Sequence, residues 1–197
     1  MSDPWFVALV GVFLLVISLA GMRLALRAGT AQAYYFTMKY GSPVADTFQL
    51  LEACRKAYAL YPWNYYFSIL AAEAAYSAWE QQRRHDDLWF HQASLWCERG
   101  LRQNPWKSQL RRVQARLLWR DSPREAIRVW REYTDWHFWE PYNHAVLAEM
   151  YAMAGDFPRA EAELLWTEGT VEEQNARRAV DSARQEWAEA LEGDWGE

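Results

Sequence analysis

An uncharged run of eighteen residues close to the amino terminus constrains this chain more than any other part of its sequence. Residues 5–22 contain no Asp, Glu, Lys or Arg. As an α-helix rising about 1.5 Å per residue, the run is roughly 27 Å long, which is enough to cross the hydrocarbon core of a bilayer. Residues 1–29 are therefore predicted to form a single transmembrane anchor followed by a juxtamembrane helix.

A cleaved signal peptide is the alternative interpretation of the same run. Ser18-Leu19-Ala20 resembles a small-residue cleavage site. However, residues 1–4 carry no Lys or Arg, whereas a signal peptide begins with a positively charged region. We therefore expect a span that is retained.

The charges that flank the run predict its orientation. No positive side chain precedes it, whereas Arg23, Arg27 and Lys39 follow it. By the positive-inside rule, the chain after the span is expected in the cytoplasm, most simply at a bacterial inner membrane. Arg23 and Arg27 are four residues apart on one helix face, so we expect them to reach lipid headgroups and expect membrane lipid as one partner.

The sequence after the span predicts helices throughout, because no segment of useful length alternates between apolar and polar residues as a strand does. Three Pro-aromatic junctions, Pro62-Trp63, Pro105-Trp106 and Pro141-Tyr142, open successive helices at separations of 43 and 36 residues. A repeat of this length is typical of stacked helical hairpins. We therefore predict an all-α fold.

The most regular hairpin resembles the tetratricopeptide repeat (TPR) family. Leu147, Ala148 and Tyr151 lie on its first helix, and Ala160 and Leu164 lie on its second. The resemblance implies that the small residues let two antiparallel helices approach closely. It also implies that about four such hairpins, over residues 30–167, form a solenoid that presents a groove to another protein.

The last part of the chain, residues 168–197, is predicted to be an acidic capping helix with a short tail. Thr170 and Glu173 have the spacing of a capping box, which marks a helix start. The following helix is polar with one narrow apolar stripe, as expected for the exposed end of a repeat array. From residue 161 onward, eleven acidic residues face only three Arg.

Positive charge is concentrated elsewhere. Residues 99–131 hold ten Lys and Arg against two acidic residues. Among them, Arg112, Arg116 and Arg120 share one helix face. One interpretation is a solvated face. The other is a site for an anionic partner, either an acidic protein segment or a lipid surface. The net charge of −5 argues against a nucleic-acid partner.

Large rings are abundant, because the chain contains 13 Trp. Most of those within predicted helices are expected to fill the core between helices: Trp63, Trp79, Trp89, Trp96, Trp106, Trp119, Trp130 and Trp166. By contrast, Trp136, Phe138, Trp139 and Tyr142 crowd around one predicted loop. So many rings in a short connection are hard to bury together, so we expect an exposed patch that docks a partner.

No motif of a catalytic, cofactor or metal site occurs. The four His residues do not show the i, i+4 spacing of a helical zinc pair. Cys54 and Cys97 have apolar neighbours and are expected to be buried thiols. We therefore predict that the protein is not an enzyme and uses no cofactor.

The function predicted from the sequence is that of a membrane-anchored scaffold or accessory subunit. Other proteins of a membrane complex would bind its anchor helix and repeat surface. The alternative is a component of an envelope glycan assembly pathway with a periplasmic repeat domain. Residues 62–66 resemble junctions in the helical-repeat tails of membrane-bound O-antigen ligases and polymerases.

Overall fold

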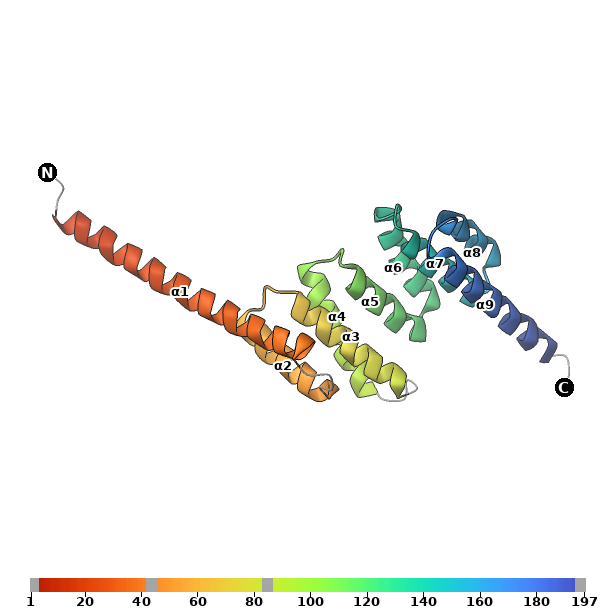
Figure 1. Cartoon of the computed structure of the whole chain (residues 1–197), viewed down its shortest axis with the longest axis horizontal. Coiled ribbons are helices and arrows are strands. Elements are labelled where there is room, and N and C mark those ends of the chain that lie inside the picture. Colours follow the sequence, from red (N-terminus) through yellow and green to blue (C-terminus); the bar gives the residue numbers. More distant parts are fainter. Residues whose placement is uncertain (1–3, 42–45, 83–86, 194–197) are drawn as a thin grey trace. The chain divides into compact units, whose positions relative to one another are not determined.

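All regular secondary structure in the described part of the chain is helical, which confirms the predicted all-α class there (Figure 1). The computed structural model describes residues 4–41, 46–82 and 87–193. The breaks predicted at residues 42–43 and 83–86 and the tail after residue 193 lie outside the described residues.

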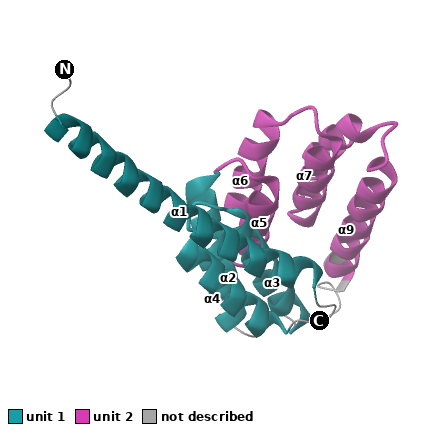
Figure 2. Ribbon diagram, turned by 60° about the vertical axis from the view of Figure 1, so that its left-hand side comes forward, with its two compact units in different colours: residues 1–104 teal, residues 105–197 magenta. Residues whose placement is uncertain are grey.

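The chain divides into two compact units, Met1–Asn104 and Pro105–Glu197 (Figure 2). The boundary falls inside the region 30–167 that the sequence suggests as one repeat domain. The second unit also contains the acidic segment after residue 168.

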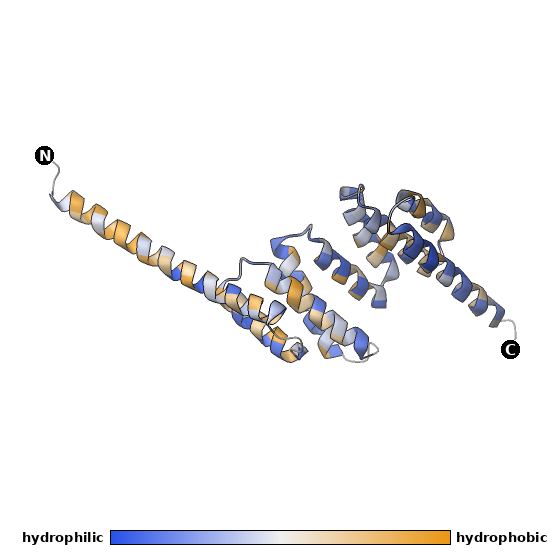
Figure 3. Cartoon of the chain, viewed as in Figure 1, coloured by the Kyte–Doolittle hydropathy of each residue, from blue (hydrophilic) through white to orange (hydrophobic). Residues whose placement is uncertain are grey.

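The first unit begins with α1, Pro4–Tyr40. This helix is long and apolar enough to cross a membrane, and its most apolar 18-residue window has a mean hydropathy of 2.5 and no buried residue. The most hydrophobic residues of this helix are concentrated in its N-terminal part (Figure 3). Length and composition alone make it a candidate span. The helix runs without a break through residue 29, so the candidate span and the helix that follows it are one rod.

The C-terminal part of α1 packs against the next helix of the first unit, and each later helix packs against the one before it. Its helices are α2 (Thr47–Leu60), α3 (Tyr66–Gln81) and α4 (Asp87–Gln103). Ala31 of α1, Ala57 of α2 and Phe67 of α3 form a small core. The small alanines allow the helix backbones to approach closely.

Arg27, which follows the uncharged run of α1, also contacts another helix of the same chain. Its Nη2 donates a hydrogen bond to the carbonyl oxygen of Ala59, at 3.2 Å. Ala59 lies in the last turn of α2, where carbonyl oxygens lack partners within their own helix and attract positive charge. This contact ties α1 to the end of α2, while the expectation that Arg27 reaches lipid headgroups stays a prediction.

The second unit contains five α-helices and one short 3-10 helix within its described residues. They are α5 (Ser108–Asp121), α6 (Pro123–Trp136), α7 (Pro141–Met153), α8 (Phe157–Leu164), η1 (Leu165–Thr167) and α9 (Glu173–Gly193). The largest side chain of its core is Trp130, which is fully buried. Ala126, Ala148 and Ala160 are also fully buried, so small residues lie where helices pack most closely.

The turn between α7 and α8 requires glycine. Gly155 has a φ of +79°, and its N–H bonds the carbonyl of Ala152 at 2.9 Å. The N–H of Asp156 bonds the carbonyl of Tyr151 at 2.9 Å, which completes the helix-ending pattern known as a Schellman motif. A Cβ at Gly155 would also lie 3.0 Å from the ring of Trp187, so the same glycine lets α9 pack on this turn.

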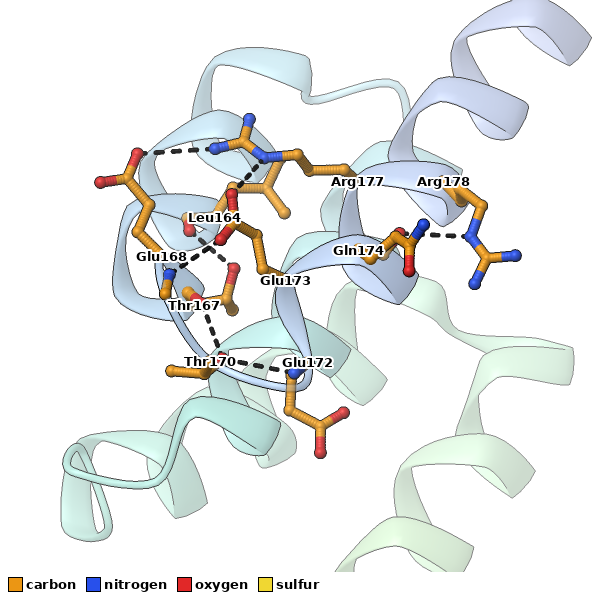
Figure 4. A network of polar contacts seen from close by, with 10 residues as sticks. Leu164, Thr167, Glu168, Thr170, Glu172, Glu173, Gln174, Arg177 and Arg178 are labelled. Carbon is orange, nitrogen blue, oxygen red and sulfur yellow. Dashed lines mark hydrogen bonds and ion pairs between the residues drawn. The ribbon is translucent and has the colours of Figure 1, made fainter.

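The start of α9 carries a capping arrangement close to the predicted one (Figure 4). Thr170 Oγ1 accepts a bond from the N–H of Glu172 at 3.3 Å. The Glu173 carboxylate reaches back to the N–H of Gly169 at 2.8 Å. In a capping box that carboxylate would bond the N–H of Thr170. The observed acceptor contact is one residue earlier, because Thr170 uses its own N–H on the carbonyl of Thr167.

The pKa of Glu173 lies below its ordinary value of 4.5, chiefly because of the Gly169 N–H bond and then because of Arg177. A carboxylate with a lowered pKa stabilises the folded state above its unfolded pKa, and the effect is lost as the pH falls through the folded pKa. We expect Glu173→Gln to unfold at lower urea concentration than the wild type at pH 7, and the difference to be smaller at pH 3. Circular dichroism at both pH values measures this. Glu189→Gln, near the other end of α9, should not lower the midpoint at pH 7.

Three of the eight tryptophans expected in the core lie at the surface instead. Those that are buried are Trp79, Trp89, Trp96 and Trp130, and Trp119 is half-buried. Those that are exposed are Trp63, Trp106 and Trp166, at 79%, 43% and 57%. The first two follow prolines, and their helices begin two or three residues later than expected, at Tyr66 and Ser108. Their rings therefore belong to turns.

Candidate functional site

The sequence predicts an exposed group of aromatic rings around the connection between α6 and α7, and three of these rings are exposed there. Trp136 ends α6, and Phe138 and Trp139 follow in the connection. Their side chains are 57%, 54% and 61% exposed. Burying a large ring away from water is favourable, so an exposed group of rings marks a place where another surface packs.

A fourth ring joins this group from another part of the chain. Trp106, just before α5, stacks on Trp136 with ring centroids 5.1 Å apart and an interplanar angle of 28°. Arg111 also contacts the ring of Trp106, with its guanidinium carbon 5.7 Å from the ring centroid. We call Trp106, Trp136, Phe138 and Trp139 the aromatic surface.

The contact between Trp106 and Trp136 joins the beginning of α5 to the end of α6. The two helices are separated by Ser122 alone and pack against each other, so their far ends meet. An antiparallel hairpin of these two helices, as the sequence predicts, brings the beginning of α5 close to the end of α6. The sequence does not reveal Trp106 as an exposed ring, because the Pro-aromatic junction predicts that this residue begins a buried helix.

Buried polar groups hold the connection in place. Asn143 and His144, both in α7, are 3% and 5% exposed. Asn143 Nδ2 donates to the carbonyl of His137 at 3.2 Å, and His144 Nε2 lies 2.7 Å from the carbonyl oxygen of Phe138. Trp130 Nε1 donates to the carbonyl of Asn143 at 3.0 Å. The aromatic surface is therefore preorganised by the core beneath it.

His144 is held on both ring nitrogens. Its Nδ1 lies 2.7 Å from a carboxylate oxygen of Glu163, opposite the contact with Phe138. The ring also stacks on Trp166 with an interplanar angle of 10°. A sequence with no ligand spacing gave no sign of this structural role.

The basic residues singled out by the sequence separate into two places. Arg112 donates from Nη1 to the hydroxyl of Tyr142 at 3.2 Å. Arg112 and Arg116 border a small cavity of about 60 Å³ between α5 and α7, together with Glu149. Arg120 is not among the residues of this cavity and lies 3.5 Å from the carboxylate of Asp121.

Tyr142 belongs to this basic face and not to the aromatic surface. Its ring is half-buried and packs against the core of the second unit. Its hydroxyl accepts the bond from Arg112. The grouping of Tyr142 with Trp136, Phe138 and Trp139 is therefore corrected, because the first turn of α7 carries it inward.

The described His, Cys, Asp and Glu residues form no group of three or more that could hold a metal ion. Burial raises the pKa of Cys54 to about 12, so this thiol is not a nucleophile near neutral pH. Cys97 is buried as well. His85 lies outside the described residues.

No family model matches this chain, and comparisons with curated proteins and with solved structures find no significant match. Any function assigned to the protein therefore depends on the residues of this chain alone.

Proposed function

We propose that this protein is a non-catalytic, membrane-anchored scaffold or accessory subunit of a membrane protein complex. Its helical units would be TPR-like repeats, and its partner would be another protein. The observation that carries the proposal is the preorganised aromatic surface of the second unit. The anchor would be α1, in a bacterial inner membrane with the remaining chain in the cytoplasm.

The chemistry of the aromatic surface favours a protein partner. Trp and Arg are enriched at binding hot spots, since a large ring buries much area at little cost in conformational entropy. Here the stacked pair of Trp106 and Trp136 is flanked by Arg111. Because His144 and Asn143 already fix the connection, binding would cost little conformational entropy of the loop.

The membrane part of the proposal is supported by α1 and by the positive charges after its apolar stretch. Its orientation can be measured with one added cysteine, because Cys54 and Cys97 are 3% and 2% exposed. Gln185→Cys places a thiol on the exposed face of α9. We expect a membrane-impermeant maleimide to label it only after the cells are permeabilised. Labelling in intact cells would contradict the cytoplasmic orientation and favour the glycan-assembly alternative.

The scaffold part is tested by purifying the full-length chain from its own membranes in a mild detergent. We expect a defined protein partner to remain bound through size-exclusion chromatography. A chain that elutes alone as a monomer, at every detergent concentration above micelle formation, would contradict the proposal.

A further inference from the structure

A second groove lies in the same unit, between α6 and the turn from α7 to α8, and shares no residue with the aromatic surface. Its volume is about 390 Å³. Four arginines line it, three from α6 and one from α8: Arg124, Arg128, Arg131 and Arg159. Ile127 and Tyr151 contribute apolar lining, and Asp156 is the single acidic residue of the lining.

Two of the four guanidinium groups are already engaged by carboxylates. Arg128 bonds Glu125 through Nη2 and Glu132 through Nη1, each at 2.6 Å. Arg159 pairs with Asp156 at 3.0 Å. These two arginines therefore have their charge largely neutralised by groups of this chain.

The other two arginines have charge to offer. Within the described residues, Arg124 and Arg131 have no ion pair or hydrogen bond, and both are exposed. They are seven residues apart, so they share one face of α6 with their Cα atoms about 10.5 Å apart along the axis. Ile127 and the neutralised Arg128 lie between them. The groove thus offers positive, apolar and positive points in a row.

This pattern selects among anionic ligands. A single compact anion is disfavoured, because the two available guanidinium groups are separated by the engaged Arg128. A continuous polyanion such as nucleic acid would place phosphates against Glu125 and Glu132. A peptide with two carboxylates at a matching separation fits the two available arginines. In an extended polyproline II conformation, residues three apart lie on one side and about 9 Å apart.

We propose that this groove binds an acidic segment of a partner protein, with two glutamates or aspartates three residues apart. Arg124 and Arg131 each take one carboxylate through charge-assisted, two-pronged hydrogen bonds. This goes beyond the scaffold function because it gives the chain a second site with its own ligand chemistry.

The test uses the full-length chain in nanodiscs of uncharged zwitterionic lipid. The probe is a fluorescein-labelled octapeptide with glutamates at its third and sixth positions and valine and leucine between them. Fluorescence anisotropy at low salt should show saturable binding. The double variant Arg124→Gln/Arg131→Gln should bind about tenfold or more weakly. Binding should weaken as salt is raised, because the charges are exposed.

Matched controls separate the groove from general charge. Arg102→Gln/Arg178→Gln removes the same charge elsewhere and should leave the affinity within about twofold. A probe with glutamines in place of the glutamates should not bind. The proposal is wrong if the wild type does not bind the acidic probe up to millimolar concentration, or if the groove variant binds it as the wild type does.

Two further arms assign the ligand source. Inorganic tripolyphosphate and vesicles containing phosphatidylglycerol are tested as competitors. If either binds more tightly than the peptide and depends on Arg124 and Arg131, the groove belongs to phosphate or lipid, and the peptide proposal is overturned. Variants of the aromatic surface should bind the peptide normally, so failure here leaves the scaffold function standing.

Discussion

Replacing Trp130 with alanine is expected to lower the unfolding free energy of the second unit by about 3–5 kcal/mol. The Trp130 ring is fully buried and packs 5.3 Å from the ring of Tyr133. Its removal leaves a cavity in the core. It also removes the hydrogen bond to the Asn143 carbonyl, which supports the connection between α6 and α7.

Hydrogen exchange in the full-length protein, followed by mass spectrometry through a urea series, measures this loss. Peptides from α6 and α7 should exchange at lower urea in the variant, while those from the first unit stay unchanged. Trp139→Ala is the matched control, because that ring is 61% exposed and its loss should cost less than about 1 kcal/mol. Equal unfolding of Trp130→Ala and wild type would contradict the described core.

The aromatic surface is expected to carry most of the affinity for the protein partner. The triple variant Trp136→Ser/Phe138→Ser/Trp139→Ser should weaken partner binding at least a hundredfold. Two of these rings at hot-spot strength, about 2 kcal/mol each, already exceed that factor. The fold should persist, because each ring is more than half exposed.

Co-purification from membranes followed by titration of the recovered partner gives the measurement. Leu165→Ser/Val171→Ser removes apolar side chains that are 66% and 88% exposed elsewhere in the same unit. This control should keep the partner. If the triple variant also keeps it, the aromatic surface is not the docking site.

The sequence predicts the exposed rings of this surface only in part, and the reason is local. Phe138 and Trp139 are foreseeable, because a short connection offers no room to bury them. Trp106 is not, because its exposure depends on α5 beginning at Ser108 and not at the Pro-aromatic junction. A proline permits a helix start at its own position without requiring one.

Contacts between distant residues are the other part that the sequence does not reveal. Arg27 and the carbonyl of Ala59 are 32 residues apart, and their meeting depends on how α1 packs on α2. Likewise, the inward placement of Asn143 and His144 depends on the rotation of α7 about its axis. Apolar residues occur on every side of α7, so helix periodicity does not determine that rotation.

The basic groove follows in part from a spacing that is visible in the sequence. Glu125 and Glu132 lie three residues before and four residues after Arg128, which is the spacing of helical ion pairs. That spacing alone marks Arg128 as neutralised. The same spacing also places Asp135 four residues after Arg131, so the sequence marks Arg124 but not Arg131 as available, and both lie on a different helix from the predicted basic face.

The most direct test of a membrane-anchored scaffold is a site-specific crosslink in intact membranes. A photoreactive benzoylphenylalanine replaces Phe138 in the aromatic surface, and a second variant carries it at Gln185 on the exposed face of α9. We predict one discrete protein adduct from position 138 and none from position 185. No protein adduct at position 138, or the same adducts from both positions, would contradict the proposed function.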